Sequence, residues 1–163
     1  MNEILTYYQA IKDGSVIVGK WVRLWYEYIV KGLEKGSFFF SPKKARAAVG
    51  FIENFCRHHE GELAPNLIHL ELWQRALVSV LFGILDADGN RQFREAFIVM
   101  GRKNGKTTLL AAIALYMMLA DGEGTAFISA GSTGALLTGA TLIVKRIKGI
   151  RRAAMGPVMP NKA

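Results

Sequence analysis

A glycine-rich basic segment, residues 101–108, carries the side chains and the spacing best suited to chemistry. It reads GRKNGKTT and joins two apolar runs. Backbone N–H groups of a glycine turn, together with the free N–H groups of a helix N-terminus, bind phosphate oxygens. Lys106 would then reach the terminal phosphates, Thr107 would bring its hydroxyl to a magnesium ion, and Thr108 would contact an inner phosphate. The segment therefore predicts a phosphate-binding loop.

The segment departs in one place from the usual phosphate-loop pattern, in which a glycine stands five positions before a second glycine. Met100 occupies that place before Gly105, and a glycine follows one residue later, at Gly101. Gly105 would still let the backbone approach a ligand closely. The alternative interpretation is a basic surface turn between a strand and a buried helix, with its charged side chains in solvent.

The residues around this loop predict one β-α-β unit. Residues 96–100 and 125–129 are continuous apolar runs, typical of strands that are buried on both faces. Residues 106–120 favour a helix that is apolar on almost every side and therefore buried, and residues 121–124 predict a turn. We therefore expect an α/β fold with a partial parallel sheet like that of P-loop NTPases, preceded by a helical N-terminal region.

Three helices are predicted before this unit. The first covers residues 15–35, the second begins at the N-cap Ser41 with Pro42 as its first helical residue, and the third covers residues 70–85. Residues 86–90, DADGN, predict a turn after the third helix. The apolar side chains expected to point inward from these helices are Val18, Val22, Trp25, Ile29, Leu33, Ala45, Ala48, Val49, Ile52, Phe55, Cys56, Trp73, Leu77, Val80, Leu81 and Ile84.

The composition of the chain limits the classes of protein to which it can belong. It has 163 residues, of which 51% are hydrophobic and 21% charged, so disorder is excluded as the main state. Its longest uncharged apolar run, residues 107–120, is shorter than the roughly 20 residues of a membrane-spanning helix. A secretory leader is not recognisable, and the single cysteine, Cys56, excludes an intrachain disulfide and favours a buried thiol. An intracellular soluble protein is expected.

The net charge of +8 is concentrated at the end of the chain. No Asp or Glu follows Glu123, whereas lysine and arginine recur from Lys145 onward. Such a tail could neutralise nucleic-acid phosphates or could be a solvated terminus. We therefore divide the chain into a helical N-terminal region (1–64), a partial P-loop ATPase core (65–129) and a basic tail of uncertain structure (130–163).

Three stretches of the chain, GRKNGKTT, the upstream LELWQ and the following ALYMMLADGEG, resemble the N-terminal ATPase region of the large terminase subunit of tailed bacteriophages. The resemblance implies a DNA-packaging ATPase that binds ATP and Mg²⁺. It implies that Gln74 reads the adenine and that Arg102 acts catalytically near the γ-phosphate. Lys103 and Asn104 match the loop without an assigned side-chain role, and Trp73 is expected in the core.

The same resemblance implies partners and a location. Double-stranded DNA, a small terminase subunit and the capsid portal are the expected partners, no membrane is expected, and the protein would work in the cytoplasm of a phage host.

The chain lacks the second half of that catalytic machinery. Hydrolysis in this family needs an Asp-Glu pair on a later strand, and a nuclease domain follows it, but no acidic residue occurs after Glu123. We therefore expect a truncated fragment without turnover, in which a change of reading frame near Ser129 would explain the glycine-rich end. A non-enzymatic, basic nucleic-acid-binding protein is the alternative, and a small-molecule kinase is disfavoured because about 100 residues precede the loop.

Overall fold

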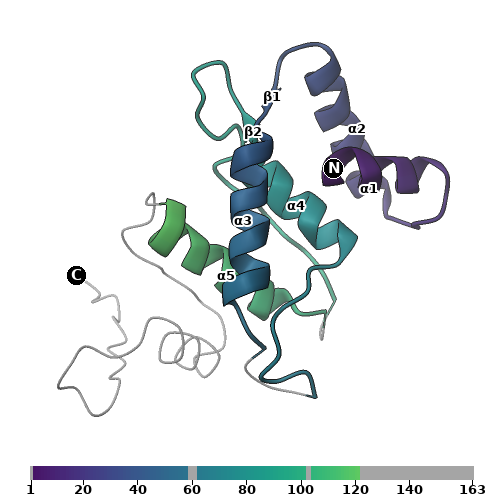
Figure 1. The fold of residues 1–163 in the computed structure, drawn as a ribbon. Helices are drawn as coiled ribbons and strands as arrows, with labels where there is room; N and C mark the ends of the chain where they lie inside the picture. The colour runs from purple at the N-terminus through teal and green to yellow at the C-terminus, as the bar shows by residue number, and fades with distance from the viewer. Residues whose placement is uncertain (1, 59–61, 102–103, 122–163) are drawn as a thin grey trace, which may run out of the picture.

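The computed structural model describes residues 2–58, 62–101 and 104–121, and this part of the chain is mostly helical (Figure 1). The elements follow one another as α1 (Glu3–Lys12), α2 (Lys20–Glu34), β1 (Phe39–Phe40), α3 (Pro42–Phe55), α4 (Leu72–Gly83), β2 (Ile84–Leu85), α5 (Lys106–Tyr116) and a π-helical turn, Met117–Asp121. Within these described ranges, no helix is both long and apolar enough to cross a lipid bilayer.

Polar side chains define where two of the helices begin. The side chain of Asn2 accepts a hydrogen bond from the backbone N–H of Ile4 at 3.2 Å and so caps α1. The hydroxyl of Ser41 accepts one from the backbone N–H of Lys44 at 3.3 Å, and Pro42 follows as the first residue of α3. Both bonds satisfy N–H groups that have no partner inside the helix. The predicted start of the second helix is therefore confirmed.

A short antiparallel ribbon closes one end of the molecule. Phe39 of β1 lies opposite Leu85 of β2, and Phe40 lies opposite Ile84. The ribbon approaches α4 closely, because a Cβ atom added to Gly83 would lie 2.8 Å from the ring of Phe40. We did not expect these strands, since two residues are too few to produce an alternating sequence pattern.

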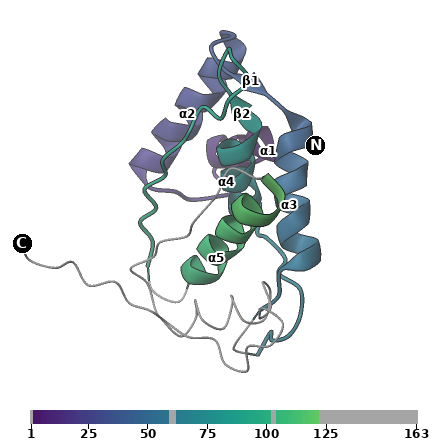
Figure 2. The same ribbon diagram turned by 90° about the vertical axis from the view of Figure 1, so that its left-hand side faces the viewer.

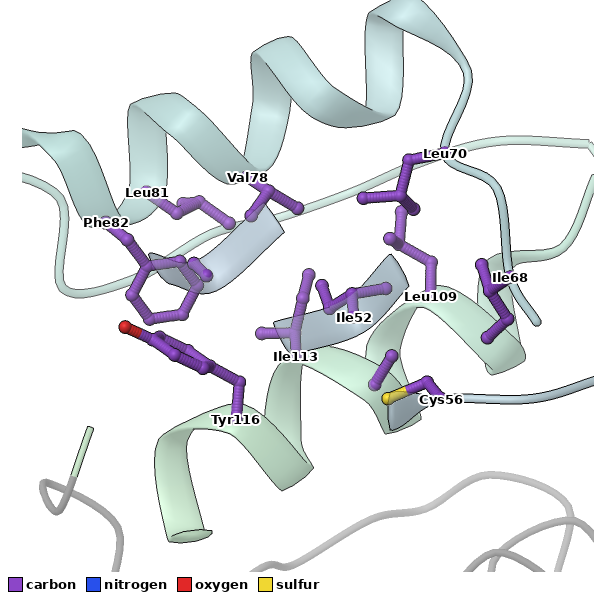
Figure 3. Packing of buried hydrophobic residues seen from close by; sticks show 12 residues of the cluster. Ile52, Cys56, Ile68, Leu70, Val78, Leu81, Phe82, Leu109, Ile113 and Tyr116 are labelled. Carbon is purple, nitrogen blue, oxygen red and sulfur yellow. The ribbon is translucent and has the colours of Figure 1, made fainter. Parts of the chain in front are cut away.

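Helix α4 lies at the centre and is covered on two sides (Figure 1). On one side it contributes Ala76 and Val80 to a cluster that it shares with α1 and α2. On the other side it contributes Val78 and Phe82 to a cluster that it shares with α3 and α5 (Figure 3). The first cluster, called the α1–α2 cluster, consists of Ile4, Tyr7, Ile11, Tyr26, Ile29, Phe38, Ala76, Val80 and Ile84. The second, called the α3–α5 cluster, consists of Ala48, Ile52, Cys56, Ile68, Leu70, Val78, Leu81, Phe82, Leu109, Ala112, Ile113 and Tyr116.

The three predicted N-terminal helices are present as α2, α3 and α4, with ends that differ by a few residues from the predicted ones. The turn at 86–90 is also confirmed, since Asp86 accepts hydrogen bonds from the backbone N–H groups of Asp88 and Asn90. Helix α1 was missed, although Asn2 and the spacing of Ile4, Tyr7 and Ile11 indicate it. Two core assignments are wrong: Val22 of α2 is 39% exposed, and Phe55 is 68% exposed because α3 ends at this residue.

The buried strand predicted over residues 96–100 is wrong as well. These residues belong to no strand, and Phe97 and Val99 are 93% and 79% exposed. In the described part of the chain no strand lies beside them, so their alternate side chains point into solvent. The second predicted strand, residues 125–129, lies outside the described residues. The partial parallel sheet of a P-loop fold therefore stays a prediction.

The helix predicted over residues 106–120 is present as α5 and the π-helical turn. Leu109 and Ile113 are buried in the α3–α5 cluster, as expected. Leu110 and Leu119 are 41% and 54% exposed, so within the described residues one side of this helix is uncovered.

Candidate functional site

The N-terminus of α5 has the geometry expected of an anion-binding loop. Gly105 is its N-cap residue and has a left-handed backbone, with φ 67° and ψ 14°. Its carbonyl accepts the first helical hydrogen bond, from the N–H of Leu109 at 2.9 Å. No side chain caps this terminus among the described residues, and the N–H groups of the first helical turn lack intrahelical partners. They and the helix dipole favour a bound anion here.

The side chains of this first turn face solvent. Lys106 and Thr107 are exposed and Thr108 is half-buried, so each of them is accessible to a ligand. No acidic residue stands in this turn. Arg102 and Lys103 lie outside the described residues, so their predicted roles at the γ-phosphate and in the loop stay predictions.

A large open cavity of about 1060 Å³ adjoins this loop. One wall is the extended segment 93–100, which runs beside α2 in Figure 2, and the other walls come from α1, α2 and α4. Two predicted site residues from distant parts of the sequence, Gln74 and Asn104, both line it. The residues around the cavity are Tyr7, Gly19, Trp21, Val22, Trp25, Tyr26, Glu71, Trp73, Gln74, Leu77, Leu81, Phe93, Glu95, Ala96, Phe97, Ile98, Val99, Met100 and Asn104.

The cavity is apolar and aromatic over most of its surface and polar at a few places. Trp21, Trp25 and Phe97 are among its aromatic residues, whereas Glu71 and Glu95 bring carboxylates to it. We did not single out any of these five as site residues. The extended segment and α2 are far apart in the sequence, so only the fold reveals that their aromatic side chains surround one space. Such a cavity suits a ligand with a long apolar body and a small polar part.

Gln74 has a structural task in addition to its place in the cavity. Its Oε1 atom accepts a hydrogen bond from the backbone N–H of Glu71 at 2.9 Å and so fixes the start of α4. The amide oxygen of Gln74 is thereby engaged in a hydrogen bond within the protein, and the NH₂ group is the part of the amide that can donate to a ligand. The adenine-reading role of Gln74 stays a prediction. Its neighbour Trp73 packs against both hydrophobic clusters, as the core assignment predicts.

Burial affects the ionisable groups near the cavity. The phenols of Tyr7 and Tyr26 have raised pKa values because burial disfavours their charged forms, and their rings meet edge to face at 4.9 Å. Both remain neutral at physiological pH. In the described ranges, no three His, Cys, Asp or Glu side chains are grouped so as to hold a metal ion.

Comparison with known proteins decides the family. The family model described as "Fatty acid synthesis protein" matches residues 73–163, more than half of the chain. The chain belongs to this family. The match begins in α4, includes the loop and α5, and continues through residues 130–163, which were expected to form a basic tail of uncertain structure.

Curated relatives carry the name phosphate acyltransferase. That of Clostridium kluyveri is 41% identical over 96 residues, which are 59% of this chain and 28% of the relative. Those of Clostridium acetobutylicum and Clostridium perfringens are 43% identical over 79 residues and 52% identical over 61 residues. These segments cover 48% and 37% of this chain and 23% and 17% of the relatives, so the chain spans about a quarter or less of their length. No solved structure matches the chain.

This membership overturns the terminase resemblance. The chain is not assigned to a bacteriophage packaging motor, and double-stranded DNA, a small terminase subunit and a portal are no longer its expected partners. The same finding overturns the alternative of a non-enzymatic nucleic-acid-binding protein. The error has a physical origin: a basic glycine turn before an apolar helix suits any phosphate-containing ligand, so a short motif of this kind does not identify the reaction.

Proposed function

We propose that this chain forms part of an acyltransferase that uses phosphate as the acyl acceptor. The observation that carries the proposal is the family match over residues 73–163, together with relatives named phosphate acyltransferase at 41–52% identity. In such a reaction a phosphate oxygen attacks the carbonyl carbon of an activated acyl group. A new C–O bond forms, the bond to the leaving group breaks with its electron pair, and an acyl phosphate results.

The N-terminus of α5 is the proposed position of the acceptor phosphate. The left-handed Gly105 exposes the N–H groups of the first helical turn, and Lys106 adds an accessible positive charge. Both features stabilise a phosphate dianion and would also stabilise the negative charge that develops on the attacked carbonyl oxygen. The acyl chain would lie in the neighbouring open cavity, along the apolar and aromatic side chains that line it.

ATP with Mg²⁺ remains the competing ligand for the same loop. The features that suit inorganic phosphate also suit a nucleotide phosphate, and Gln74 and Asn104 line one cavity. The two ligands differ in their magnesium requirement and in their use of Gln74. We expect the protein to act in the cytoplasm, a reducing compartment that suits its buried free thiol, Cys56.

A binding experiment on the whole chain tests the proposal. Phosphate binding is measured by calorimetry for the chain, for Lys106→Gln and for the control Lys43→Gln, whose lysine is exposed on α3. We expect Lys106→Gln to weaken phosphate binding about tenfold and the control to leave it unchanged. Gln74→Ala should not affect phosphate binding, whereas it should weaken ATP binding if a nucleotide is the true ligand.

The reaction itself is tested by supplying acyl thioesters with phosphate and trapping any acyl phosphate with hydroxylamine. The assay uses both this chain and the chain extended to the length of its relatives. Acyl hydroxamate that forms only with phosphate and falls with Lys106→Gln supports the proposal. Phosphate-independent thioester loss, or no product from the extended protein, contradicts it.

A further inference from the structure

The large cavity beside segment 93–100 carries charge of one sign only. Among the described residues that line it there is no lysine, arginine or histidine, whereas Glu71 and Glu95 contribute two carboxylates. Both glutamates are exposed, so a ligand can reach them, and between described residues neither of them forms an ion pair. The chain as a whole has a net charge of +8, so the lining of this cavity is opposite in sign to the rest of the protein.

Aromatic rings form much of the same lining, and packing holds some of them in place. The rings of Trp25 on α2 and Phe93 on the extended segment lie 6.0 Å apart at an angle of 64°. Trp25 also meets Tyr26 at 5.0 Å and 75°. Rings packed edge to face in this way present aromatic faces in different directions. The aromatic lining includes Trp21, Trp25, Tyr26, Trp73, Phe93 and Phe97, which come from α2, α4 and the segment that runs beside α2 (Figure 2).

One ring of this lining already attracts a cation that belongs to the protein. The ammonium group of Lys20 lies 5.7 Å from the centre of the Trp21 ring, although Lys20 itself does not line the cavity. The negative face of an aromatic ring attracts a positive charge in this way. Trp25 and Phe97 have no such cation among the described residues, so they are the rings that we expect a ligand to use.

We propose that this cavity binds an organic cation, namely an alkylated ammonium group that carries a short apolar chain. The rings and the carboxylates of Glu71 and Glu95 attract the charged head, and the apolar chain lies along Leu77 of α4 and Ile98 of the extended segment. The inference goes beyond the proposed function and does not depend on it, because it requires neither phosphate nor the N-terminus of α5. An acyl chain would use the same apolar lining, so it would compete with the cation.

The tryptophans of the chain make the cavity directly observable. The chain contains three tryptophans, Trp21, Trp25 and Trp73, and all of them line the cavity. Titration of the whole chain with hexyltrimethylammonium, without phosphate or thioester, should therefore change its intrinsic fluorescence. Hexanoate and hexanol carry the same chain with a negative and a neutral head. We expect the cation to bind about tenfold more tightly than either, with an affinity that falls as the salt concentration rises.

Calorimetry of variants assigns the binding to particular residues. Glu71→Gln/Glu95→Gln should weaken binding of the cation about tenfold and leave hexanol unchanged, because glutamine keeps the shape of the side chain and removes its charge. The matched control is Glu34→Gln, at an exposed carboxylate in the last turn of α2 that does not line the cavity. Phe97→Leu should weaken the cation more than hexanol. Phe55→Leu, at an exposed ring of α3, should change neither.

Several outcomes would overturn the cation site. Hexanol or hexanoate that binds as tightly as the cation would show that the cavity selects the apolar chain alone. A loss in Glu34→Gln equal to that in the double variant would assign the effect to overall charge. Unchanged fluorescence of the folded chain would equally overturn it. Lys106→Gln should leave cation binding unchanged, so failure of this site is distinguishable from failure of the acyltransferase proposal. Circular dichroism of each variant establishes that it is folded.

Discussion

Arg75 of α4 contacts one carboxylate oxygen of Glu53 on α3 through two nitrogens, Nη2 at 2.8 Å and Nε at 3.0 Å. The same oxygen of Glu53 accepts the backbone N–H of Leu70 at 3.0 Å. Glu53 therefore ties α3 to α4 and to the segment that leads into α4. Among the ion pairs between described residues, the pair of Glu53 and Arg75 joins two different helices, whereas Glu27 and Lys31 both belong to α2.

Glu53→Gln should lower the free energy of unfolding by about 1–2 kcal/mol, because the charge-assisted contacts to Arg75 are lost while an amide oxygen can still accept from Leu70. Urea denaturation followed by circular dichroism measures the change. Glu27→Gln is the control, since its pair with Lys31 lies within one helix and is exposed. A loss as large in the control would show that general charge, and not this tie, is responsible.

Gly32→Ala should destabilise the protein by about 2 kcal/mol despite the higher helix propensity of alanine. A Cβ atom at Gly32 would overlap the ring of Phe38, which is buried in the α1–α2 cluster. Thermal or urea unfolding provides the measurement. Phe38→Leu added to Gly32→Ala should recover part of the loss, because the smaller side chain leaves space. No recovery would mean that the alanine acts through something other than this contact.

Gly105→Ala should destabilise the start of α5 by about 1 kcal/mol and weaken phosphate binding. The added Cβ would meet no other atom, so the effect comes from the left-handed backbone, which alanine adopts poorly. Gly50→Ala is an informative control, because Gly50 lies within α3 with an ordinary helical backbone and space for a Cβ atom. There the same substitution should stabilise the protein by up to about 1 kcal/mol. Equal signs for the two substitutions would contradict this account.

Cys56 should make the protein less stable as pH rises from 9 to 11. Burial raises the pKa of its thiol to about 11, from an ordinary value of 9.0, because the thiolate is disfavoured in the α3–α5 cluster. Between pH 9 and pH 11 the thiol keeps its proton in the folded state and releases it in the unfolded state. The contribution of the protonated thiol to the free energy of unfolding is therefore complete below pH 9 and is lost as the pH rises through 11. Urea unfolding across this range measures it.

Cys56→Ala should remove that part of the pH dependence and leave the part that comes from the buried phenols. The folded chain should also react slowly with iodoacetamide at pH 8 and rapidly once urea unfolds it. Fast alkylation of the folded chain would contradict the burial of the thiol.

The sequence predicts α2, α3, α4 and α5 because their signals are local, although α1 was missed. Ser41 and Pro42 mark the start of α3 by their own chemistry, and the apolar spacing along α2 and α4 corresponds to the faces that the clusters bury. The exposed segment 93–100 could not be predicted in this way. An apolar run indicates a strand only if a neighbouring strand pairs with it, and the position of the neighbour is a property of the fold.

The candidate site was predicted in part. The loop chemistry identified Gly105, whose left-handed backbone only a glycine adopts easily. The cavity beside it was not predicted, because Trp21 and Phe97 are distant in the sequence and each is a residue type that is common in hydrophobic cores. The reaction was predicted wrongly, because a loop that suits phosphate does not reveal what is transferred to it or from it.

The central position of α4 has a consequence for how the protein opens. Each hydrophobic cluster includes residues from one side of α4, so disruption of either cluster exposes that side of α4 to solvent. The loss of one cluster therefore destabilises the other. The amide protons of Val78 and Val80 should therefore be among the slowest to exchange with deuterated solvent. Those of the π-helical turn Met117–Asp121 should exchange far sooner, so local opening begins at that end while α4 persists until the last cooperative step.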